Sequence, residues 1–436
     1  TTASYADRSI RTRLPAERDL ANALAVSRPT LRAALTDLRA RGLVGALQGS
    51  GTWIADRGRR SGRSFAEAVV GKAALNLAAS VPWDARALAA CGFRLTAREI
   101  FALTPADGYG TGLVELQEIV ASRSSARGLP TGPANVVVTP GAQRALLATL
   151  ELVTSPGDRI LVEREAYPGT FDVCEALRLI PVPVDFHEPG AVDRALARRS
   201  AAAALLQPIV NNPTGDALAD EHLAALARVF DRRRLPVIEN NVLAELRFDN
   251  RPPPGIAERC GRAPVFTIGS LSKSVWGGLR VGWVRAPEAP AAELRRRIHR
   301  MELGMSAPSQ LIAEQVLRTI DAVLVRRRRE LARAATLARE QLAAQLPSWR
   351  SDPPRGGLSL WVELPVRDTD PFVEHASGHG VDVLPGRLAD ANRRPSSHIR
   401  LSFDRPRPML CEGIERLAAA WATYPPARTA RPDASA

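Results

Sequence analysis

The residue whose chemistry stands out first is a lysine. The 436-residue chain has only two, Lys72 and Lys273, and every other Lys/Arg position is arginine. Arginine stays protonated at any accessible pH, so it cannot form a Schiff base with a carbonyl compound, whereas lysine can. Lys273 ends the serine-rich turn 269–273, which follows the apolar run 265–268, and Arg280 comes seven residues later. A cofactor with a reactive carbonyl would therefore have two possible attachment points.

Further polar turns follow apolar runs elsewhere in the chain. The turn Thr139-Pro140-Gly141-Ala142-Gln143 precedes a helical stretch, whose free backbone amides would make an anion site. Tyr167 and Asn212 lie in turns after the runs 161–163 and 205–206, and Arg400 lies within the apolar stretch 398–403. Each of these, taken alone, is as well explained by an ordinary turn or a core position.

The segments that must position these residues alternate between two kinds. From about residue 75 onward, apolar runs alternate with helical stretches, which predicts a mainly parallel sheet covered by helices. Ligands in such sheets bind at the carboxyl ends of the strands, where the turns lie. The predicted strands are Asn135–Val138, Arg159–Glu163, Ala201–Leu206, Val237–Ile238, Val265–Ile268 and Val281–Arg285.

The first 64 residues are strongly basic. They hold twelve arginines and five acidic residues, so they carry +7 of the net charge of +13. A short, concentrated basic segment favours a polyanionic partner such as nucleic acid. A solvated, arginine-rich surface is the alternative explanation.

The same segment predicts two helices and a hairpin. The first helix has Leu20, Ala21, Leu24 and Ala25 on one face. Ser27 is the expected N-cap of a second helix, from Arg28 to about Arg41, with a buried stripe of Leu31, Ala34, Leu35 and Leu38. Strands at 43–47 and 52–54 flank a glycine-rich turn.

Two helices followed by a hairpin form the winged helix-turn-helix plan, in which the second helix enters the major groove of DNA. Arg28, Thr30 and Arg32 would then reach bases or phosphates, and Gln48, Gly49 and Ser50 would form the wing tip. Any small helical hairpin remains the alternative. We predict this DNA-binding domain at 1–55, a flexible arginine-rich linker at 56–74, the large domain at 75–423 and a disordered tail at 424–436.

Both parts resemble known families. The motif from Leu14 to Ile54, with L-P-x-E-R-x-L-A, V-S-R-x-T-L-R and Q-G-S-G-T-W-I, resembles GntR-type DNA-binding domains. Residues 75–423 resemble fold type I aminotransferases, which use pyridoxal 5'-phosphate (PLP). The combination is similar to MocR-type bacterial transcription regulators. The expected fold is a mostly helical winged helix-turn-helix with a β wing, joined to an α/β aminotransferase-like domain.

The resemblance implies a role for each residue in the polar turns. Lys273 would form the Schiff base with PLP, and Tyr167 would stack on the ring. Asn212 would bond the ring hydroxyl, and Arg400 would bind the α-carboxylate of an amino-acid-like ligand. The phosphate would be held by Gly141, Ala142, Gln143, Ser270, Ser272 and Arg280, with Tyr109 reaching the phosphate of a partner subunit, which implies a homodimer.

One stretch departs from the pattern of active aminotransferases. Asn240 stands where those enzymes have an Asp that pairs with the pyridine nitrogen, and Leu243 (or Val242) replaces a Tyr. A neutral amide does not keep the nitrogen protonated, so the ring would accept electrons less well. We therefore expect little transaminase activity. The alternative is that Glu239 or another acid replaces the missing Asp.

Several classes of protein fit the sequence poorly. It has no apolar run of about 18 residues and no signal-peptide pattern. The cysteines at 91, 174, 260 and 411 form no C-x-x-C pair, which argues against a disulfide framework or zinc site and fits a reducing cytoplasm. His375 and His379 are four residues apart, but no acidic third ligand is evident, so we predict no metal site.

The sequence therefore favours a DNA-binding transcription regulator that binds PLP and senses an amino acid, an amine or PLP itself. Two alternatives remain: an active PLP-dependent aminotransferase with a vestigial DNA-binding domain, and a DNA-binding protein whose large domain serves only for dimerisation.

Overall fold

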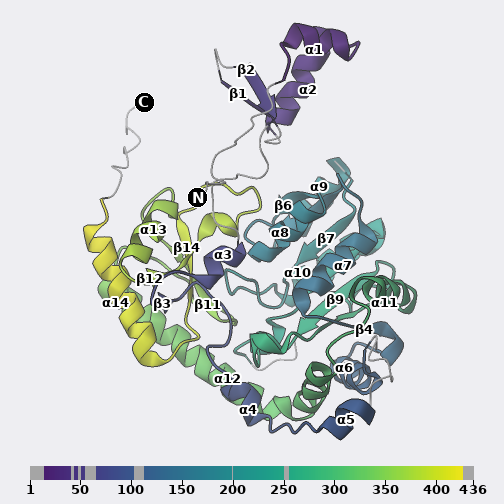
Figure 1. Ribbon diagram of the computed structural model, residues 1–436, viewed down its shortest axis with the longest axis vertical. Helices are drawn as coiled ribbons and strands as arrows, with labels where there is room; N and C mark the ends of the chain where they lie inside the picture. Colours follow the sequence, from purple (N-terminus) through teal and green to yellow (C-terminus); the bar gives the residue numbers. More distant parts are fainter. Residues whose placement is uncertain are drawn as a thin grey trace, which may run out of the picture. The chain divides into compact units, whose positions relative to one another are not determined.

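The structure, a computed structural model, describes residues 14–40, 44–47, 51–54, 65–102, 112–198, 200–249 and 255–425. The chain divides into two compact units, Thr1–Arg63 and Ser64–Ala436 (Figure 1). We call them the reader unit and the large unit. No helix in these ranges is long and apolar enough to cross a membrane.

The reader unit has the predicted helix-turn-helix and hairpin. Its elements are α1 (Glu17–Ala23), α2 (Arg28–Ala40), β1 (Val44–Leu47) and β2 (Gly51–Ile54), the last two paired antiparallel. The predicted N-cap is confirmed, because the Thr30 amide donates to the Ser27 hydroxyl at 3.2 Å.

The buried stripe of this unit is narrower than predicted. Leu31 and Leu35, one turn apart on α2, pack against Ala21 of α1. Ala34 is exposed because it lies about 100° around the helix from Leu35, away from α1. Leu24 and Ala25 are also exposed, since α1 ends at Ala23 and Ala25 turns the chain with a φ of 51°. Leu38 lies outside the residues whose side chains are described.

The large unit is built on the predicted, mainly parallel sheet. Its strand order is β4-β10-β9-β8-β7-β5-β6, and within this sheet β10 alone runs against its neighbours. All six predicted strands are present. The strands are β4 (Val136–Thr139), β5 (Arg159–Glu163), β6 (Ile180–Val184), β7 (Ala203–Leu206), β8 (Val237–Asn240), β9 (Val265–Ser270) and β10 (Gly282–Arg285).

Strand β6 is the one that the apolar pattern did not predict. Its sequence, Ile-Pro-Val-Pro-Val, holds two prolines, which cannot donate to a neighbouring strand. The structure places it at the edge of the sheet, paired with β5 alone. A strand with one free edge tolerates proline, which explains its place.

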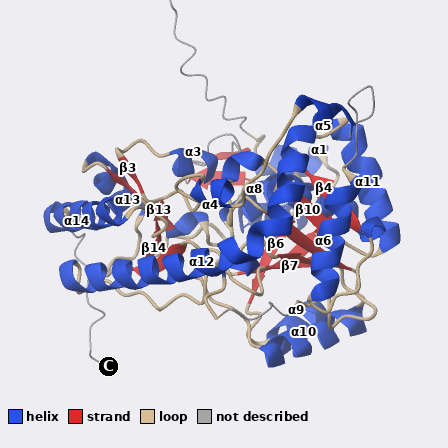
Figure 2. Cartoon of the chain, turned by 90° about the horizontal axis from the view of Figure 1, so that it is seen from below, coloured by secondary structure: helices blue, strands red, loops and turns tan. Residues whose placement is uncertain are grey.

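Helices cover the sheet and continue into a second lobe (Figures 1 and 2). Helix α7 packs along β4, β8, β9 and β10, so its N-terminus lies at the carboxyl edge of the sheet. The helices are α3 (Phe65–Val70), α4 (Arg86–Ala90), α5 (Ala97–Ala102), α6 (Val114–Ala126), α7 (Ala142–Val153), α8 (Pro168–Ala176), α9 (Pro189–Arg198), α10 (Asp220–Arg233), α11 (Glu288–Glu302), α12 (Ala307–Gln345), α13 (Asp370–Gly378) and α14 (Arg407–Thr423).

The second lobe, which we call the small lobe, holds a separate antiparallel sheet. Its strands are β11 (Ser359–Glu363), β14 (His398–Ser402) and β13 (Leu384–Pro385), in that order. A short parallel pair, β3 (Leu75–Asn76) and β12 (Val381–Asp382), lies alongside. The 39-residue helix α12 contacts α4, α5 and α6 at one end and α14 at the other, so it ties the lobes together.

The predicted linker, residues 56–74, extends too far toward the C-terminus, because part of it forms a helix. Residues 65–70 form α3, where Phe65, Ala68 and Val69 pack against Ala78, Leu384 and Leu388. The apolar residues follow the i, i+3, i+4 spacing of one helical face, which buries them. Residues 55–64 lie outside the described residues. So do residues 426–436 of the predicted tail, whereas Tyr424 packs against Trp421.

Candidate functional site

A cavity of about 400 Å³ lies at the carboxyl ends of the parallel strands. This volume falls in the usual range of small-molecule sites. The turns after β4, β5, β7, β8 and β9 all contribute to its wall. Its lining residues are Val81, Pro82, Ala142, Gln143, Tyr167, Gln207, Asn212, Asn240, Val242, Leu243, Ser272, Lys273, Trp276, Gly277, Gly278 and Arg280.

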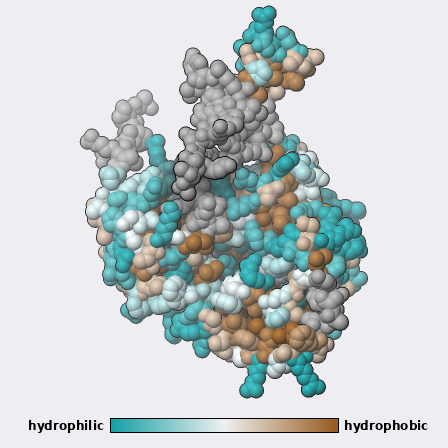
Figure 3. All heavy atoms as spheres, viewed as in Figure 1, coloured by the Kyte–Doolittle hydropathy of each residue, from teal (hydrophilic) through white to brown (hydrophobic). Residues whose placement is uncertain are grey.

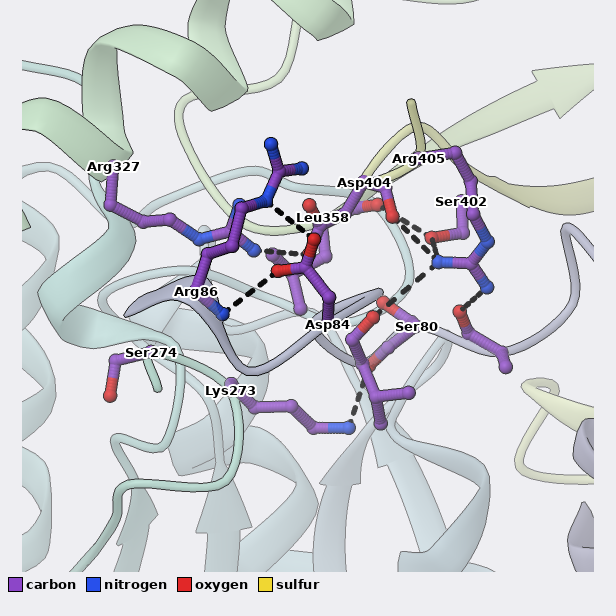
Figure 4. Close-up of polar contacts among 12 residues, drawn as sticks. Ser80, Asp84, Arg86, Lys273, Ser274, Arg327, Leu358, Ser402, Asp404 and Arg405 are labelled. Atoms are coloured by element: carbon purple, nitrogen blue, oxygen red, sulfur yellow. Dashed lines mark hydrogen bonds and ion pairs between the residues drawn. The ribbon is translucent and has the colours of Figure 1, made fainter. Parts of the chain in front are cut away.

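Lys273 is the one lysine in the described lining of this cavity. Burial, together with the guanidinium groups of Arg400 and Arg280, lowers the pKa of its amine to about 7. Its Nζ donates a hydrogen bond of 2.7 Å to the backbone carbonyl of Ser80 (Figure 4). At neutral pH a large fraction of the amine is therefore uncharged and nucleophilic.

The N-terminus of α7 forms the anion-binding end of the cavity. Its N-cap is Gly141, with a φ of 88° and no capping side chain, so the first helical amides keep no side-chain partner there. Arg280, which donates to the carbonyl of Pro140 at 3.1 Å, brings a cation to the same place. Helix amides and an arginine together favour a phosphate or carboxylate.

Glycine is required beneath this helix end. A Cβ on Gly282 of β10 would lie 2.7 Å from the carbonyl carbon of Gly141 and 2.8 Å from the amide nitrogen of Ala142. Ser270 is buried below the turn, where its hydroxyl lies 3.0 Å from that of Ser272 and 2.9 Å from the carbonyl of Val281. These contacts fix the turn that carries Lys273.

Arg400 lies beside the cavity and does not line it. Only 1% of the residue is exposed. Its Nη1 donates to Asn212 Oδ1 at 2.9 Å and its Nη2 to the carbonyl of Ala78 at 2.8 Å. Its Nε is buried with no hydrogen-bond partner among the described residues. Burial lowers the pKa of this guanidinium to about 10, so it stays charged at neutral pH.

Tyr167 lines the cavity close enough to Arg400 and Arg280 for both charges to act on its phenol. Burial raises the pKa of its phenol to about 12, so the ring is neutral. The ring of Phe65, from α3, meets the Tyr167 ring edge-on at 5.3 Å, and the Arg400 guanidinium lies 5.8 Å from the Phe65 ring centre. Phe65 thus lies close to both Tyr167 and Arg400, although it is not among the residues that line the cavity.

Strand β8 places Asn240 in the cavity and Glu239 behind the sheet. Asn240 is buried, and its Oδ1 accepts from the amide of Val242 at 3.4 Å. Glu239 accepts from the Thr267 hydroxyl at 2.6 Å and the Ile256 amide at 2.9 Å, outside the cavity. Successive strand residues face opposite sides, so Glu239 does not take the place of the absent Asp. Within the described residues, no carboxylate lines this cavity.

The structure brings most of the predicted cofactor residues together. Those that line the cavity are Ala142, Gln143, Tyr167, Asn212, Asn240, Ser272, Lys273 and Arg280, with Gly141 and Ser270 supporting it from below. Tyr109 lies outside the described residues. The residues that sequence reasoning missed are Gln207, Trp276 and the segment that carries Phe65 and Ser80. The apolar spacing at 65–69 was the available signal for that segment.

A larger cavity of about 680 Å³ adjoins the first and shares Gln207 with it. It holds none of the predicted site residues. Burial raises the pKa of Glu163 in its wall to about 7, but no lysine and no helix N-terminus lie there. Its lining is mainly polar and rich in carboxylates, so we assign the chemistry to the smaller cavity.

In the reader unit, Arg28, Thr30 and Arg32 lie on the exposed part of α2. The Arg32 Nε lies 2.9 Å from a carboxylate oxygen of Glu17 on α1, and the Thr30 hydroxyl lies 2.7 Å from that of Ser27. The predicted wing-tip residues Gln48, Gly49 and Ser50 lie outside the described residues.

Comparison with known proteins identifies both units. Residues 98–417 match the family "Aminotransferase class I and II", and residues 9–54 match "Bacterial regulatory proteins, gntR family". The chain belongs to the class I and II aminotransferase family and carries a gntR-type helix-turn-helix ahead of it. This is the architecture of MocR-type transcription regulators.

Relatives share this organisation. The chain is 30% identical to the uncharacterized HTH-type transcriptional regulator YdcR of Escherichia coli over 307 residues, 67% of this chain and 64% of YdcR. It is 25% identical to the uncharacterized HTH-type transcriptional regulator YisV of Bacillus subtilis, over 91% of this chain and 88% of YisV. The match thus spans slightly less than two thirds of YdcR.

A solved structure with the same fold is LysN, the α-aminoadipate aminotransferase of Thermus thermophilus, complexed with N-(5'-phosphopyridoxyl)-L-leucine. Its TM-score is 0.74 at 23% identity, covering 83% of this chain and 95% of LysN. The predicted α/β fold of the large unit is confirmed.

Replacing Gly282 with alanine tests the anion site. The new methyl group would push against the backbone of Gly141 and Ala142 and misplace the helix amides, so we expect Gly282→Ala to weaken binding of inorganic phosphate about tenfold or more. Isothermal titration calorimetry gives the affinity. Gly378→Ala is the matched control, because a Cβ there meets nothing within 4 Å. Equal phosphate affinity in the two folded variants would contradict the assignment.

Proposed function

We propose that this chain is a DNA-binding transcription regulator whose large unit binds PLP at Lys273 and responds to an amino-acid-like effector. The single observation that supports it most is the convergence of an activated lysine, an anion-binding helix end and Arg280 in one cavity, with Arg400 close enough to lower the pKa of that lysine. An amine, or PLP itself, is the other form that the effector could take.

The residues of the cavity fit PLP without rearrangement of the sheet. The α7 amides and Arg280 would hold its phosphate, and Lys273 would attach to its aldehyde carbon. Tyr167 would stack on the ring and Asn212 would bond the ring hydroxyl. Gln143 donates its amide N–H to the Gly169 carbonyl at 2.9 Å, and its buried Oε1, which has no partner among the described residues, could accept a hydrogen bond from an N–H or O–H group of a ligand.

Asn240 makes the site suited to capture rather than turnover. Bound PLP supplies an electron sink, which is strongest when its ring nitrogen is protonated. The Asn240 amide, with no carboxylate beside it in the described lining, gives that proton no counter-charge. A charge-assisted hydrogen bond contributes about 1.5–3 kcal/mol, so transamination would lose roughly one to two orders of magnitude in rate. Attachment of PLP and of an amine does not need the sink.

The reader unit supplies the second half of the function. Arg28 and Thr30 lie in the first turn of α2, where the helix dipole also favours a phosphate. The exposed ion pair between Arg32 and Glu17 is weakly stabilising, about 0–1 kcal/mol, so Arg32 can exchange Glu17 for DNA at little cost. Sequence recognition by the second helix is the usual mode of this motif.

We further propose that the protein acts as a homodimer. Four large apolar side chains, Phe101, Trp276, Met301 and Leu303, are between 41% and 79% exposed in the single chain. Exposed apolar side chains favour a protein partner where they gather in a patch, as they do in the lower part of Figure 3, over α4 and α5. Trp276 also lines the cavity. A monomeric mass by light scattering at micromolar concentration would contradict the dimer.

The cofactor assignment is tested by titrating the full chain with PLP. We expect the visible absorption band of the lysine-bound cofactor in the wild type and in Lys72→Ala, and no such band in Lys273→Ala. Because the pKa of Lys273 is lowered to about 7, its neutral amine already predominates above pH 7. The rate of band formation should therefore rise with pH up to about 7 and then level off. A band in Lys273→Ala, or a rate that keeps rising to pH 10, would contradict the assignment.

Restoring the acid at position 240 tests why turnover is weak. We expect Asn240→Asp to raise the rate of oxo-acid formation from L-amino acids by about ten- to a hundredfold. Stopped-flow absorbance of PLP-loaded protein, with each of the common L-amino acids, measures it. Asn392→Asp adds the same charge at an exposed position and should change nothing. If the rates of both variants equal that of the wild type, the amide at 240 does not limit turnover.

A further inference from the structure

Residues 76–81, which we call the carbonyl segment, lead from the end of β3 to the wall of the cavity. Each backbone carbonyl of the segment accepts a hydrogen bond from outside it, all but one from a basic side chain. The donors, in chain order from Asn76 to Val81, are Arg405 Nε at 2.9 Å, the Ser402 amide at 2.7 Å, Arg400 Nη2 at 2.8 Å, Arg405 Nη2 at 2.6 Å, Lys273 Nζ at 2.7 Å and Arg405 Nη1 at 3.4 Å. Beyond Asn76 the segment has no helix or strand of its own, so these bonds determine its path.

Arg405 holds more of this segment than any other donor. Only 8% of the residue is exposed, and its remaining acceptors are the carbonyl of Asp404 at 2.7 Å and the hydroxyl of Ser402 at 3.4 Å. The Asp404 carboxylate pairs with Arg327 instead (Figure 4). Burial lowers the pKa of the Arg405 guanidinium, because all its hydrogen-bond acceptors among the described residues are neutral. The planar arginine fork, with donors in three directions, suits several carbonyls along one bend of the chain, whereas lysine has a single nitrogen.

The bonds of Arg405 fix the direction of the Ser80 carbonyl. The two neighbouring carbonyls, of Ala79 and Val81, both face Arg405. The Ser80 carbonyl between them faces Lys273. Figure 4 shows Lys273 and Arg405 approaching the chain around Ser80 from different sides. Because each peptide unit is planar, successive carbonyls of a stretched chain point to opposite sides, so holding the two neighbours turns the Ser80 carbonyl toward the lysine.

The Ser80 carbonyl in turn fixes the amine of Lys273. It is the one hydrogen-bond acceptor of Nζ among the described residues. The lysine side chain is flexible, so without this bond its amine would sample several positions in the cavity. Attack on a carbonyl carbon requires the two atoms at about 3–3.5 Å with the nitrogen lone pair aligned. A neutral amine that donates one N–H to Ser80 keeps its lone pair directed away from that oxygen and free for the attack.

We propose that Arg405 is a positioning residue for Lys273, and that it holds the carbonyl segment so that the Ser80 carbonyl orients the lysine amine for attachment to PLP. Arg405 is not part of the described cavity lining, so it acts on the lysine through the backbone at Ser80. This inference rests on the proposed function and adds to it a residue outside the cavity on which the attachment of PLP depends.

Arg405→Met removes every donor of this side chain and tests the proposal in the full-length chain. The measurement is the rate at which the absorption band of lysine-bound PLP forms, followed over a range of pH. We expect the plateau rate to fall by about ten- to a hundredfold, since a misplacement of about 1 Å costs up to that much. The midpoint of the pH dependence should stay near 7, because burial, Arg400 and Arg280 lower the pKa of Lys273. Arg407→Met removes a charge from an exposed neighbouring position and should change neither quantity.

The affinity for inorganic phosphate distinguishes positioning from a general loss of structure. The proposed phosphate site consists of the α7 amides and Arg280, with which Arg405 makes no hydrogen bond. Calorimetric titration should therefore give the same phosphate affinity for Arg405→Met and the wild type. Arg405→Gln, which keeps one amide donor group, is the variant to use if Arg405→Met does not fold, and it should lower the plateau rate in the same direction by a smaller factor.

A plateau rate equal to that of the wild type, in Arg405→Met or in the Arg405→Gln variant that replaces it, would overturn this inference and leave the proposed function standing. So would a loss of rate that a shifted pH midpoint or weaker phosphate binding fully accounts for, because the residue would then act through charge or through overall structure. If the wild type itself forms no band with PLP, the proposed function fails and this inference fails with it.

Discussion

Two basic side chains, Lys273 and Arg400, are buried at the carboxyl edge of the sheet, where their hydrogen-bond partners among the described residues are neutral oxygens. These are the carbonyls of Ser80 and Ala78 and the amide of Asn212. A buried cation without a counter-ion is costly, and the lowered pKa values of both groups reflect that cost. Neither group has an ion pair within the part of the chain that the structure describes, so the surrounding backbone and side chains must hold both in place. The sheet, α7 and the segment that carries Ala78 and Ser80 do so together.

This electrostatic arrangement determines which ligands fit. Arg280 and the N-terminus of α7 add further positive potential, and the described lining contains no carboxylate that would offset it. A ligand with two anionic groups, one at each end, therefore gains most. The same positive surplus would disfavour a protonated pyridine nitrogen beside Asn240, so in the proposed function the affinity for an anionic cofactor and the weak transamination have one cause. A regulator benefits from this combination, because a ligand that is bound and not consumed reports its own concentration.

The sequence predicted those parts of the structure that depend on local pattern. The parallel strands followed from apolar runs, the Ser27 cap from side-chain chemistry, and the cavity lining from polar turns after strands, which a parallel sheet must bring to one edge. Family resemblance, rather than spacing, supplied the roles of the individual residues.

The remaining features depend on tertiary contacts. Strand β6 escaped prediction because its prolines disfavour a strand anywhere except at an edge, and the edge position is set by the whole sheet. Helical spacing predicts that Ala34 is buried with Leu31 and Leu35. In the structure α1 packs only against Leu31 and Leu35, so Ala34 stays exposed. Helix α3 was predicted as part of the linker because the arginine-rich residues 56–64 precede it and its apolar residues make up less than two helical turns. The backbone carbonyls of Ala78 and Ser80, which accept hydrogen bonds from Arg400 and Lys273, could not be predicted from side-chain types, because every residue has a backbone carbonyl.

The central claim, that ligand binding in the large unit controls DNA binding by the reader unit, is tested most directly by DNA affinity. Fluorescence anisotropy with a fragment from upstream of the protein's own gene, at fixed salt, would compare PLP-loaded protein with and without a saturating amino acid that shifts its absorbance. We expect the dissociation constant for DNA to change by about fivefold or more, and Arg400→Ala to abolish the change. The same DNA affinity in the free and saturated forms would contradict the claim.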